Sequence, residues 1–526
     1  MIRMRSRVKN NILVLMILIA LVYAILEIRP SKANPKVPAW HGVLQCMSIA
    51  ISDLVYGLEG NVGYRKVYDI IYPSLESGDA GVPIETMNKA ISKTLSIENV
   101  SASGIQFIAG TGTANGMIDF MKLSFTLFGF QAESFFYLYM VLLIIPVLIF
   151  IISFRNNLHY LIIGFIFIIC YQLIASTSIV KFETILHVRF IALLTILPTI
   201  HLALLVMDRH KFTLFTLMGA SIQASVLLFS FYIRSHSRYQ LMFLASLPVF
   251  LFIYNKIKFK TKVKLNQFWP LAVILTSFLL FQMYVSLIRD SSVADKDSAY
   301  PVWHQTYMGL AGHPQAKEKY GIEFSDASAL RQVIKSEAEK GNILSYDDMV
   351  QDTIHGVDPA KQKSKITLVG VEYGNIIKKE YFKIVINDPL FVISSYLYKI
   401  PTYIKACLSG SKNASYLPES YGNVDGLRKL FNPFRIAVIA LISFLFSREI
   451  ILTHWKSYFL LLLFNSVFAL IPPFITLPAC HSVLDSTLLL SIIFYFLFAI
   501  GIAKCIIILK HLFIKFFYHY LFFYRD

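Results

Sequence analysis

Long apolar runs with almost no charged residues constrain this chain more than any other feature of its sequence. A helix rises about 1.5 Å per residue, so a run of ~20 apolar residues crosses the ~30 Å hydrocarbon core of a bilayer. Charged residues make up 15% of the chain, against ~25% in soluble domains. The sequence therefore predicts an all-α polytopic membrane protein with about ten transmembrane helices. The ten runs lie at about 11–26, 135–153, 158–176, 190–207, 212–233, 240–255, 268–288, 434–447, 458–477 and 486–503, and the sixth and eighth are short.

The distribution of charge predicts the orientation of these helices. The formal net charge is +17, and the cations gather in the N-terminal residues and in every second connection between the apolar runs. Lysine and arginine accumulate on the cytoplasmic side of membrane proteins. Both termini are therefore expected in the cytoplasm, and both large hydrophilic segments are expected outside it. Since this pattern accounts for the basic composition, no nucleic acid partner is expected.

Five parts follow from this arrangement. The first apolar run is interpreted as an uncleaved anchor, because no good small-residue cleavage site follows it. The hydrophilic segments are expected to hold short helices, among them 43–56 on the membrane surface, 371–386, and a helix that Asp388 caps and Pro389 begins. The parts are 1–29, an N-terminal membrane anchor; 30–134, a first periplasmic loop with surface helices; 135–288, a six-helix transmembrane block; 289–432, a second periplasmic helical segment; and 433–526, C-terminal transmembrane helices with a cytoplasmic interfacial tail.

The apolar runs also argue against some kinds of chemistry. No Asp or Glu lies inside any of them, whereas ion- and proton-coupled transporters place ionisable groups at mid-membrane. Transport is therefore a less favoured interpretation. The five cysteines have no metal-ligand spacing, so no metal or cofactor is expected. The default expectation is that the cysteines are unpaired thiols. A disulfide between Cys407 and either Cys46 or Cys480 is the open alternative.

Asp53 is the candidate catalytic residue, since it interrupts the apolar run SIAISDLVYGL. A carboxylate held against an apolar surface gains basicity, as a general base requires. The alternative is that Ser52 or Asp53 caps a helix that follows it. The residue types leave both interpretations open.

Candidate substrate-binding residues come from parts of the chain predicted to lie outside. Cations are normally sparse on that side, yet two short connections carry several. Arginine suits an anionic headgroup or a pyrophosphate, and snorkelling to phospholipid phosphates is the alternative. At the start of the second hydrophilic segment, side chains that combine aromatic faces with hydrogen-bonding groups can cover a site at the bilayer surface. The candidates are Lys181, Arg189, Arg234, His236 and Arg238 in the connections and Trp303, His304 and Tyr307 in the segment.

Five stretches of the chain carry a resemblance: GYRKVYDIIYP, IDFMKLSFTLFG, RFIALLTILPTIHLALL, YPVWHQTYMGLAGHPQAKEKYGIEFSD and KKEYFKIVINDPLFVISSYLYKI. They are similar to segments of bacterial families with GT-C-like architecture. The layout of the whole chain, with one span, an external loop of surface helices, a many-helix block and a further external helical part, resembles the GT-C class of membrane glycosyltransferases. The resemblance implies a GT-C-like fold and transfer of a sugar from a polyprenyl-phosphate carrier to an acceptor at the periplasmic face. In that class an acidic residue of the first external loop acts as base, and cations steady the leaving phosphate. Asp53 best matches the acid, and Arg189, Arg234 and Arg238 best match the cations.

The same resemblance implies a multi-pass protein of the bacterial inner (plasma) membrane, with a lipid-linked sugar donor and membrane lipids as its partners. One alternative is an enzyme of the O-antigen polymerase or ligase type, which would depend on Arg234, Arg238 and His304 rather than on Asp53. Another is a non-catalytic envelope protein that binds lipid or a partner through its external helices.

Overall fold

The computed structural model covers the 526-residue chain. The structure describes this chain except for the following residues: 1, 29–35, 38–40, 59–61, 73–81, 99, 101–105, 109–114, 177–190, 208–211, 234–238, 259–267, 289–299, 324–325, 350–365, 367–370, 410–432, 448–449, 451–454, 476–483 and 524–526. The side chains of some further residues at the ends of elements are not described either.

Each of the ten apolar runs is helical over most of its described length, which confirms a helical protein of membrane type. By length and composition, five helices of the described residues can cross a membrane: Val8–Leu26, Glu133–Phe154, Leu214–Ile233, Trp269–Leu287 and Leu488–Phe517. The other runs form shorter apolar helices. The helices of the runs are α1 (Ile2–Ile28), α6 (Glu133–Phe154), α7 (Leu158–Ser176), the 3-10 helix η3 (Ile191–Thr195) continued by α9 (Ile196–Met207), α10 (Leu214–Ile233), α11 (Tyr239–Lys258), α12 (Trp269–Ile288), α21 (Pro433–Leu445), α23 (Trp455–Ile475) and α24 (Leu484–Phe523).

The core of the bundle is formed by helices that are apolar on every side. All residues of the segment 191–206 are buried, as expected for a helix without a polar face. Two polar side chains inside the core are paired: Gln223 Nε2 donates to the carbonyl oxygen of Pro146 at 3.0 Å and lies 2.8 Å from His201 Nδ1. The His201 ring also meets the edge of Phe150. His201 is therefore a hydrogen-bonded packing residue, as its isolation in an apolar run suggests.

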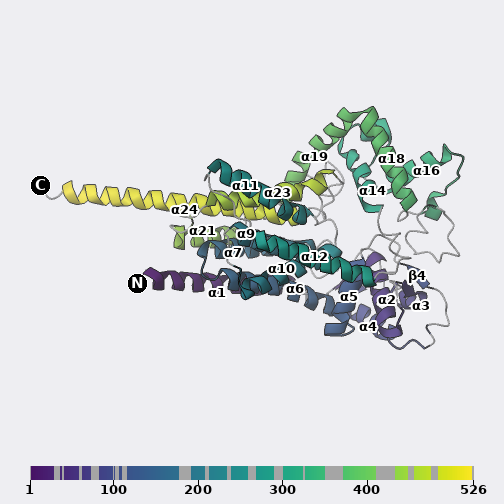
Figure 1. The fold of residues 1–526 in the computed structure, drawn as a ribbon, viewed down its shortest axis with the longest axis horizontal. Helices are drawn as coiled ribbons and strands as arrows, with labels where there is room; N and C mark the ends of the chain where they lie inside the picture. The colour runs from purple at the N-terminus through teal and green to yellow at the C-terminus, as the bar shows by residue number, and fades with distance from the viewer. Residues whose placement is uncertain are drawn as a thin grey trace.

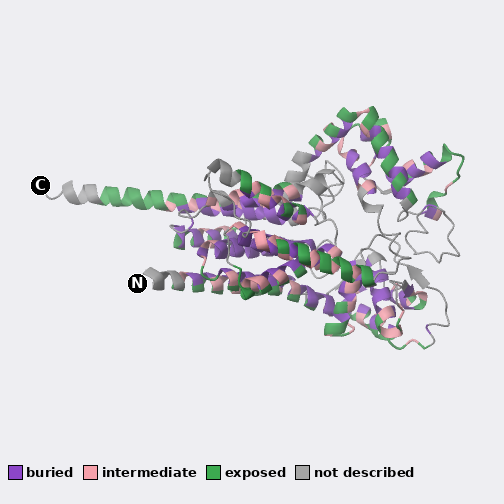
Figure 2. Cartoon of the chain, viewed as in Figure 1, coloured by how far each residue is buried: buried purple, intermediate pink, exposed green. Residues whose placement is uncertain are grey.

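The start of α1 and the end of α24 lie at one end of the bundle, and both hydrophilic segments lie at the other (Figure 1). This shared end agrees with the relative placement expected from the charge distribution. Residues along the middle of the bundle are largely buried. Helix α24 extends past the other helices, and its residues 507–517 are exposed there (Figure 2). The tail that is expected at the membrane interface is continuous with the last apolar run in α24.

The first hydrophilic segment combines short helices with two small antiparallel strand pairs that the sequence did not predict. Lys36 pairs with Pro83 in one of them, and Val62 pairs with Ile108 in the other. Helix α2, expected on the membrane surface, instead buries its apolar face against α3 and α5. The elements are β1 (Lys36–Val37), α2 (His41–Tyr56), β2 (Val62–Tyr64), α3 (Arg65–Ile71), β3 (Val82–Pro83), α4 (Ile84–Thr94), β4 (Gln106–Ile108) and α5 (Asn115–Phe128).

The second hydrophilic segment has a hydrophobic core of its own. Tyr307, Leu330, Val333, Tyr373 and Ile377 are among its buried residues. Helices α14, α16 and α18 pack on one another, and α19 joins them to α23 and α24 of the bundle. The elements are α14 (Tyr300–Gly309), the 3-10 helix η6 (Leu310–Gly312), α15 (Ala316–Tyr320), α16 (Asp326–Ala338), α18 (Val371–Asn387) and α19 (Pro389–Ser409).

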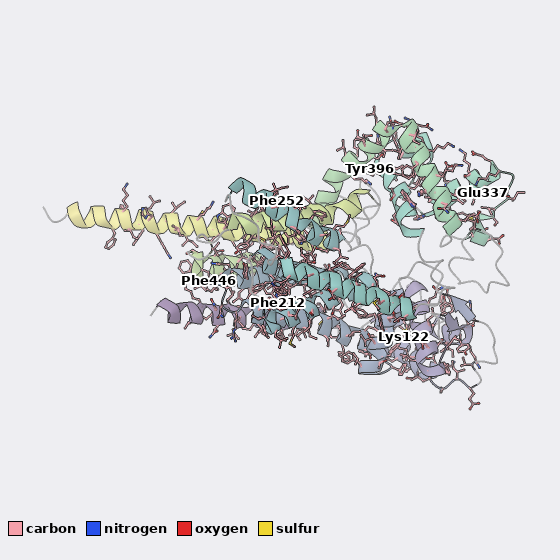
Figure 3. The ribbon with its side chains drawn as sticks, viewed as in Figure 1. Lys122, Phe212, Phe252, Glu337, Tyr396 and Phe446 are labelled. Atoms are coloured by element: carbon pink, nitrogen blue, oxygen red, sulfur yellow. The ribbon has the colours of Figure 1, made fainter. Side chains whose placement is uncertain are left out.

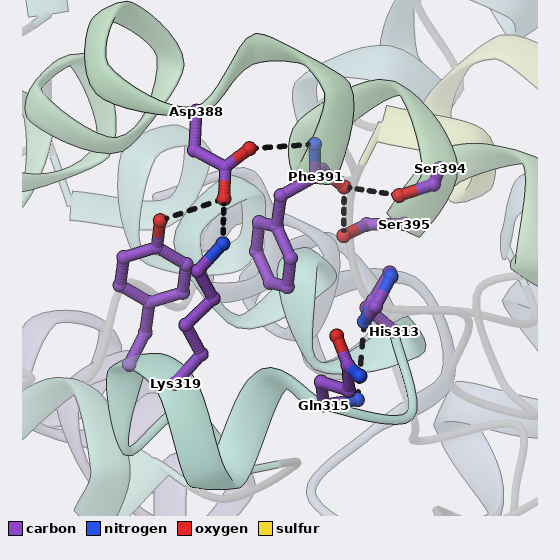
Figure 4. A network of polar contacts seen from close by, with 8 residues as sticks. His313, Gln315, Lys319, Asp388, Phe391, Ser394 and Ser395 are labelled. Carbon is purple, nitrogen blue, oxygen red and sulfur yellow. Dashed lines mark hydrogen bonds and ion pairs between the residues drawn. The ribbon is translucent and has the colours of Figure 1, made fainter.

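Asp388 caps α19 as the sequence predicts (Figure 4). Its Oδ1 accepts the backbone N–H of Phe391 at 3.2 Å, and Pro389 is the first residue of the helix. Its Oδ2 accepts the hydroxyl of Tyr320 at 3.0 Å and pairs with Lys319. The hydrogen bond from Lys319 holds the pKa of the Asp388 carboxyl below its usual value. One carboxylate therefore joins α15 to the start of α19.

Lys399 on α19 is buried, with 2% of its surface exposed. Gly312 leaves room for its aliphatic stem, because a Cβ at that position would overlap Lys399 Cγ. Its Nζ lies 4.7 Å from the centre of the Tyr396 ring. Burial lowers the pKa of Lys399 from its ordinary 10.5 to about 7, since an ammonium loses solvation in the protein interior.

Replacing Lys399 with methionine is expected to stabilise the protein at pH 7 and to flatten part of its pH dependence. Between the folded pKa of about 7 and the unfolded pKa near 10.5, the unfolded state binds more protons. The free energy of unfolding of the wild type therefore rises with pH in that window, by up to about 1.4 kcal/mol per unit. Below the window both states are protonated and this slope vanishes.

Thermal unfolding midpoints of the solubilised full chain, followed upwards from about pH 7, measure this slope. The variant Lys379→Met is the matched control, because Lys379 is an exposed lysine on the neighbouring helix α18. It should retain the wild-type slope. A Lys399→Met protein with that same slope would contradict the expectation.

Candidate active site

Four polar side chains meet where the first hydrophilic segment joins the bundle. Lys122 on α5 forms an ion pair with Asp53 on α2, and its Nζ lies 4.0 Å from Asp119 Oδ1. The hydroxyl of Tyr232 on α10 donates to Asp119 Oδ2 at 2.7 Å. Figure 3 labels Lys122 in this region, at the end of the molecule opposite the termini. Asp53, Asp119, Lys122 and Tyr232 are called the Asp53 cluster below.

Asp53 lies within α2, which runs from His41 to Tyr56, and no helix begins at this residue. Ser52 lies inside α2 as well, so the alternative that Ser52 or Asp53 caps a following helix is wrong. Gly57, with φ of +66°, comes directly after α2, and its N–H donates to the Asp53 carbonyl at 2.9 Å. The Ser52 hydroxyl bonds within the helix and accepts the Tyr64 N–H at 3.0 Å. The chain around Asp53 is thus fixed to β2, which leaves the carboxylate to face α5.

Helix α5 presents Asp119 and Lys122 on one face because residues three apart lie one above the other. Phe120 and Met121, between them in sequence, are buried. Gly116 lies one turn before Asp119, and a Cβ there would be 2.5 Å from backbone atoms of Tyr232. The missing side chain lets α5 touch the end of α10. This close contact brings the Tyr232 hydroxyl within reach of Asp119.

The charged groups of the cluster are partly shielded from solvent. The exposed fractions of the side chains are 21% for Lys122, 25% for Asp53 and 28% for Asp119. A substrate can therefore reach them, while the limited exposure reduces screening of their charges. A carboxylate here can accept a proton from a hydroxyl group, and the ammonium can bind phosphate oxygens. One cluster thus offers both a base and a cation.

The aromatic candidates lie in the core of the second hydrophilic segment. His304 is fully buried, and its Nδ1 is 2.6 Å from the Tyr373 hydroxyl. Tyr307 is 2% exposed. The Trp303 ring packs on Tyr381 at 6.0 Å between ring centres. The structure therefore gives these residues packing contacts within the second segment and does not bring them into the Asp53 cluster.

The predicted cations lie outside the described residues. Lys181, Arg189, Arg234, His236 and Arg238 all fall in the connections 177–190 and 234–238. Their roles stay predictions.

The sequence argument missed Asp119, Lys122 and Tyr232. The signal was present in the stretch IDFMKLSFTLFG, where Asp119 and Lys122 stand three apart just before a hydrophobic run. A charge pair at this spacing is usually a solvated helix face. Nothing in the sequence indicated that α10 would approach it.

The described residues hold no group of three or more His, Cys, Asp or Glu side chains placed to bind a metal. Cys46 is buried in α2, Cys170 is buried in α7, and Cys505 is exposed on α24. The side chains of Cys407 and Cys480, to which the possible disulfides refer, lie outside the description.

A search of family models, of curated proteins and of solved structures found no match to this chain.

Proposed function

We propose that this chain is a GT-C-like membrane glycosyltransferase that moves a sugar from a polyprenyl-phosphate donor to an acceptor at the periplasmic face. The Asp53 cluster carries the proposal, because it joins a carboxylate and an ammonium at the end of an apolar helical bundle. Transfer from a phosphate carrier needs a base for the acceptor hydroxyl and positive charge for the departing phosphate. The resemblance of the five sequence stretches supports the same class.

In the proposed reaction the acceptor oxygen attacks the anomeric carbon of the donor sugar. The Asp53 carboxylate takes the proton of that hydroxyl, and the bond between the anomeric carbon and the phosphate oxygen breaks. The electron pair of this bond stays with the polyprenyl phosphate. The Lys122 ammonium, which pairs with Asp53 before substrate binds, binds the phosphate oxygens instead and so releases the carboxylate. Asp119, held by Tyr232, keeps Lys122 in place.

The proposed setting is a bacterial inner membrane crossed about ten times, with both termini in the cytoplasm. The donor reaches the cluster from the outer leaflet, since a polyprenyl chain stays in lipid while its phosphate lies at the headgroup level. The common end of the bundle that carries both hydrophilic segments supports this setting (Figure 1). Arg234 and Arg238 come two and six residues after Tyr232 in sequence. They are the proposed further cations for the phosphate.

The test uses the purified full chain. Lipids that copurify with it are identified by mass spectrometry, and the protein in lipid vesicles is then given a panel of synthetic polyprenyl-phosphate monosaccharides with an extract of envelope glycans as acceptor. Release of polyprenyl phosphate together with a glycosylated product is the expected result. The variant Lys122→Met should raise the donor KM, whereas Lys66→Met, at an exposed lysine on α3, should not.

Two results would overturn the proposal. One is the absence of any bound polyprenyl lipid and of any release across the donor panel. The other is full activity after loss of Asp53 with dependence on Arg234, Arg238 and His304, which indicates the polymerase or ligase type.

A further inference from the structure

A cavity of 530 Å³ opens between α15, α16 and α18 of the second hydrophilic segment. Its volume is in the ~300–1,000 Å³ range of small-molecule sites. The lining includes Arg331 and Lys335 from α16, Lys383 from α18, and Tyr307 from α14. Residues from several helices thus face a single space, which the core of the segment holds open.

The cavity is lined by an excess of positive charge. Within the described part of the chain, the lining holds the four cations Lys319, Arg331, Lys335 and Lys383 and the one carboxylate of Glu380. Lys319 is paired with Asp388. Among the residues that the structure describes, the other three cations form no ion pair within 4 Å.

The remaining cations repel one another unless an anion joins them. Arg331 and Lys335 are four residues apart on α16, and like charges at that spacing destabilise a helix. Lys383 adds a third positive charge from the facing helix α18. Arg331 lies near enough to Glu323 to help lower the pKa of that carboxyl, but the ion pair of Glu323 is with Lys317 at 2.8 Å. An anionic ligand would therefore relieve this repulsion.

Other residues of the lining suit hydroxyl groups rather than an anion. The Glu380 side chain is buried, and its Oε2 accepts the Gln332 amide at 2.8 Å. The nearby Tyr307 hydroxyl is also buried, and burial together with the charge of Glu380 raises the pKa of that phenol. A protonated phenol, an amide and a carboxylate can donate to and accept from hydroxyl groups. The Glu380 charge would repel a ligand that is anionic throughout.

We propose that this cavity binds an anionic saccharide, with its phosphate or carboxylate group at Arg331, Lys335 and Lys383 and its hydroxyl groups at Gln332 and Glu380. The ligand carries both an anionic group and hydroxyl groups because the lining holds partners for both. This site is separate from the Asp53 cluster. Its occupation does not depend on the proposed transferase reaction.

The experiment measures binding to the full chain in detergent by titration calorimetry at low salt. The probes are glucose 1-phosphate, glucuronate, inorganic phosphate and glucose. At least one charged sugar should bind at least tenfold more tightly than either phosphate or glucose. Binding of glucose 1-phosphate alone assigns a phosphate group to the natural ligand, and binding of glucuronate alone assigns a carboxylate.

Variants locate the site. The double variant Lys335→Gln, Lys383→Gln should weaken binding of the charged sugar at least tenfold, whereas Lys379→Gln, an exposed lysine on α18 outside the cavity, should not change it. Gln332→Leu should weaken binding of the charged sugar but leave any binding of inorganic phosphate unchanged. Equal binding of inorganic phosphate and the charged sugars, no binding of either, or full binding by the double variant would overturn the proposal.

Discussion

Replacing Asp53 with asparagine is expected to reduce release of polyprenyl phosphate from the donor by about 100- to 10,000-fold, the usual contribution of a general base. Asparagine has nearly the shape of aspartate but does not take up the proton of the acceptor hydroxyl. The helix around residue 53 is held by backbone and serine hydrogen bonds, so the fold should persist. The loss is expected in kcat more than in the donor KM.

A matched control is available in the same hydrophilic segment. Asp69 on α3 has a side chain that is 54% exposed and pairs with Arg65 one turn earlier. Exposed pairs contribute about 0–1 kcal/mol, so Asp69→Asn should retain wild-type release and stability. If Asp53→Asn and Asp69→Asn release polyprenyl phosphate at the same rate, Asp53 is not the base.

A variant at Asp119 tests whether this residue positions Lys122 or takes part in proton transfer. The variant Asp119→Asn retains the proposed base but removes one of the two carboxylates beside Lys122. It should raise the donor KM with a smaller change in kcat, because the cation and not the base is disturbed. A fall in kcat as large as that of Asp53→Asn would contradict a role for Asp119 in positioning alone.

Among the glycines that the structure describes, Gly116 is the one whose replacement with alanine is expected to cause the largest loss of stability. The new Cβ would lie 2.5 Å from backbone atoms of Tyr232 and Ile233. Backbone cannot turn aside as a side chain can, so α5 must move away from α10. Overpacking of this kind costs about 1–3 kcal/mol, and the movement would also break the bond between Asp119 and Tyr232. The midpoint of thermal unfolding should fall by several degrees, and activity should fall with it.

Gly501 provides the comparison. It lies in α24, it is exposed, and no atom comes within 4 Å of a Cβ built there. Gly501→Ala should leave the midpoint unchanged or raise it, because alanine favours a helix over glycine by about 1 kcal/mol. Tyr232→Phe keeps the close approach of the helices and removes the hydrogen bond alone. Equal midpoints for the Gly116→Ala and Gly501→Ala proteins would contradict the close contact of α5 and α10.

The helices of the bundle could be predicted because their signal is local. Each apolar run contains the information for its own helix, and the Asp388-Pro389 pair indicates where α19 begins. The two strand pairs could not be predicted in the same way. They are two or three residues long, which is too short for an alternating pattern, and their partners are more than forty residues apart.

The candidate site was predictable only in part. Asp53 stands out by residue type alone, since it is a carboxylate in an apolar run. Its partner Lys122 depends on the packing of α5 against α2, and Tyr232 enters because Gly116 lets two helices touch. Such contacts join residues that are far apart in sequence. Conversely, His304 suggests chemistry by its type, but its hydrogen bond with Tyr373 in a closed core indicates a packing role.

Helix α24 has a practical consequence for handling the protein. Its 40 residues extend about 60 Å at ~1.5 Å per residue, twice the ~30 Å of hydrocarbon in a bilayer. The part that leaves the bundle exposes isoleucine, leucine and phenylalanine, among them Leu509, Phe513 and Phe516 (Figure 2). A detergent belt sized for the bundle alone would leave this part of α24 in water. Extraction therefore calls for an amphiphile that also covers it, because the exposed apolar surfaces of neighbouring molecules would otherwise associate.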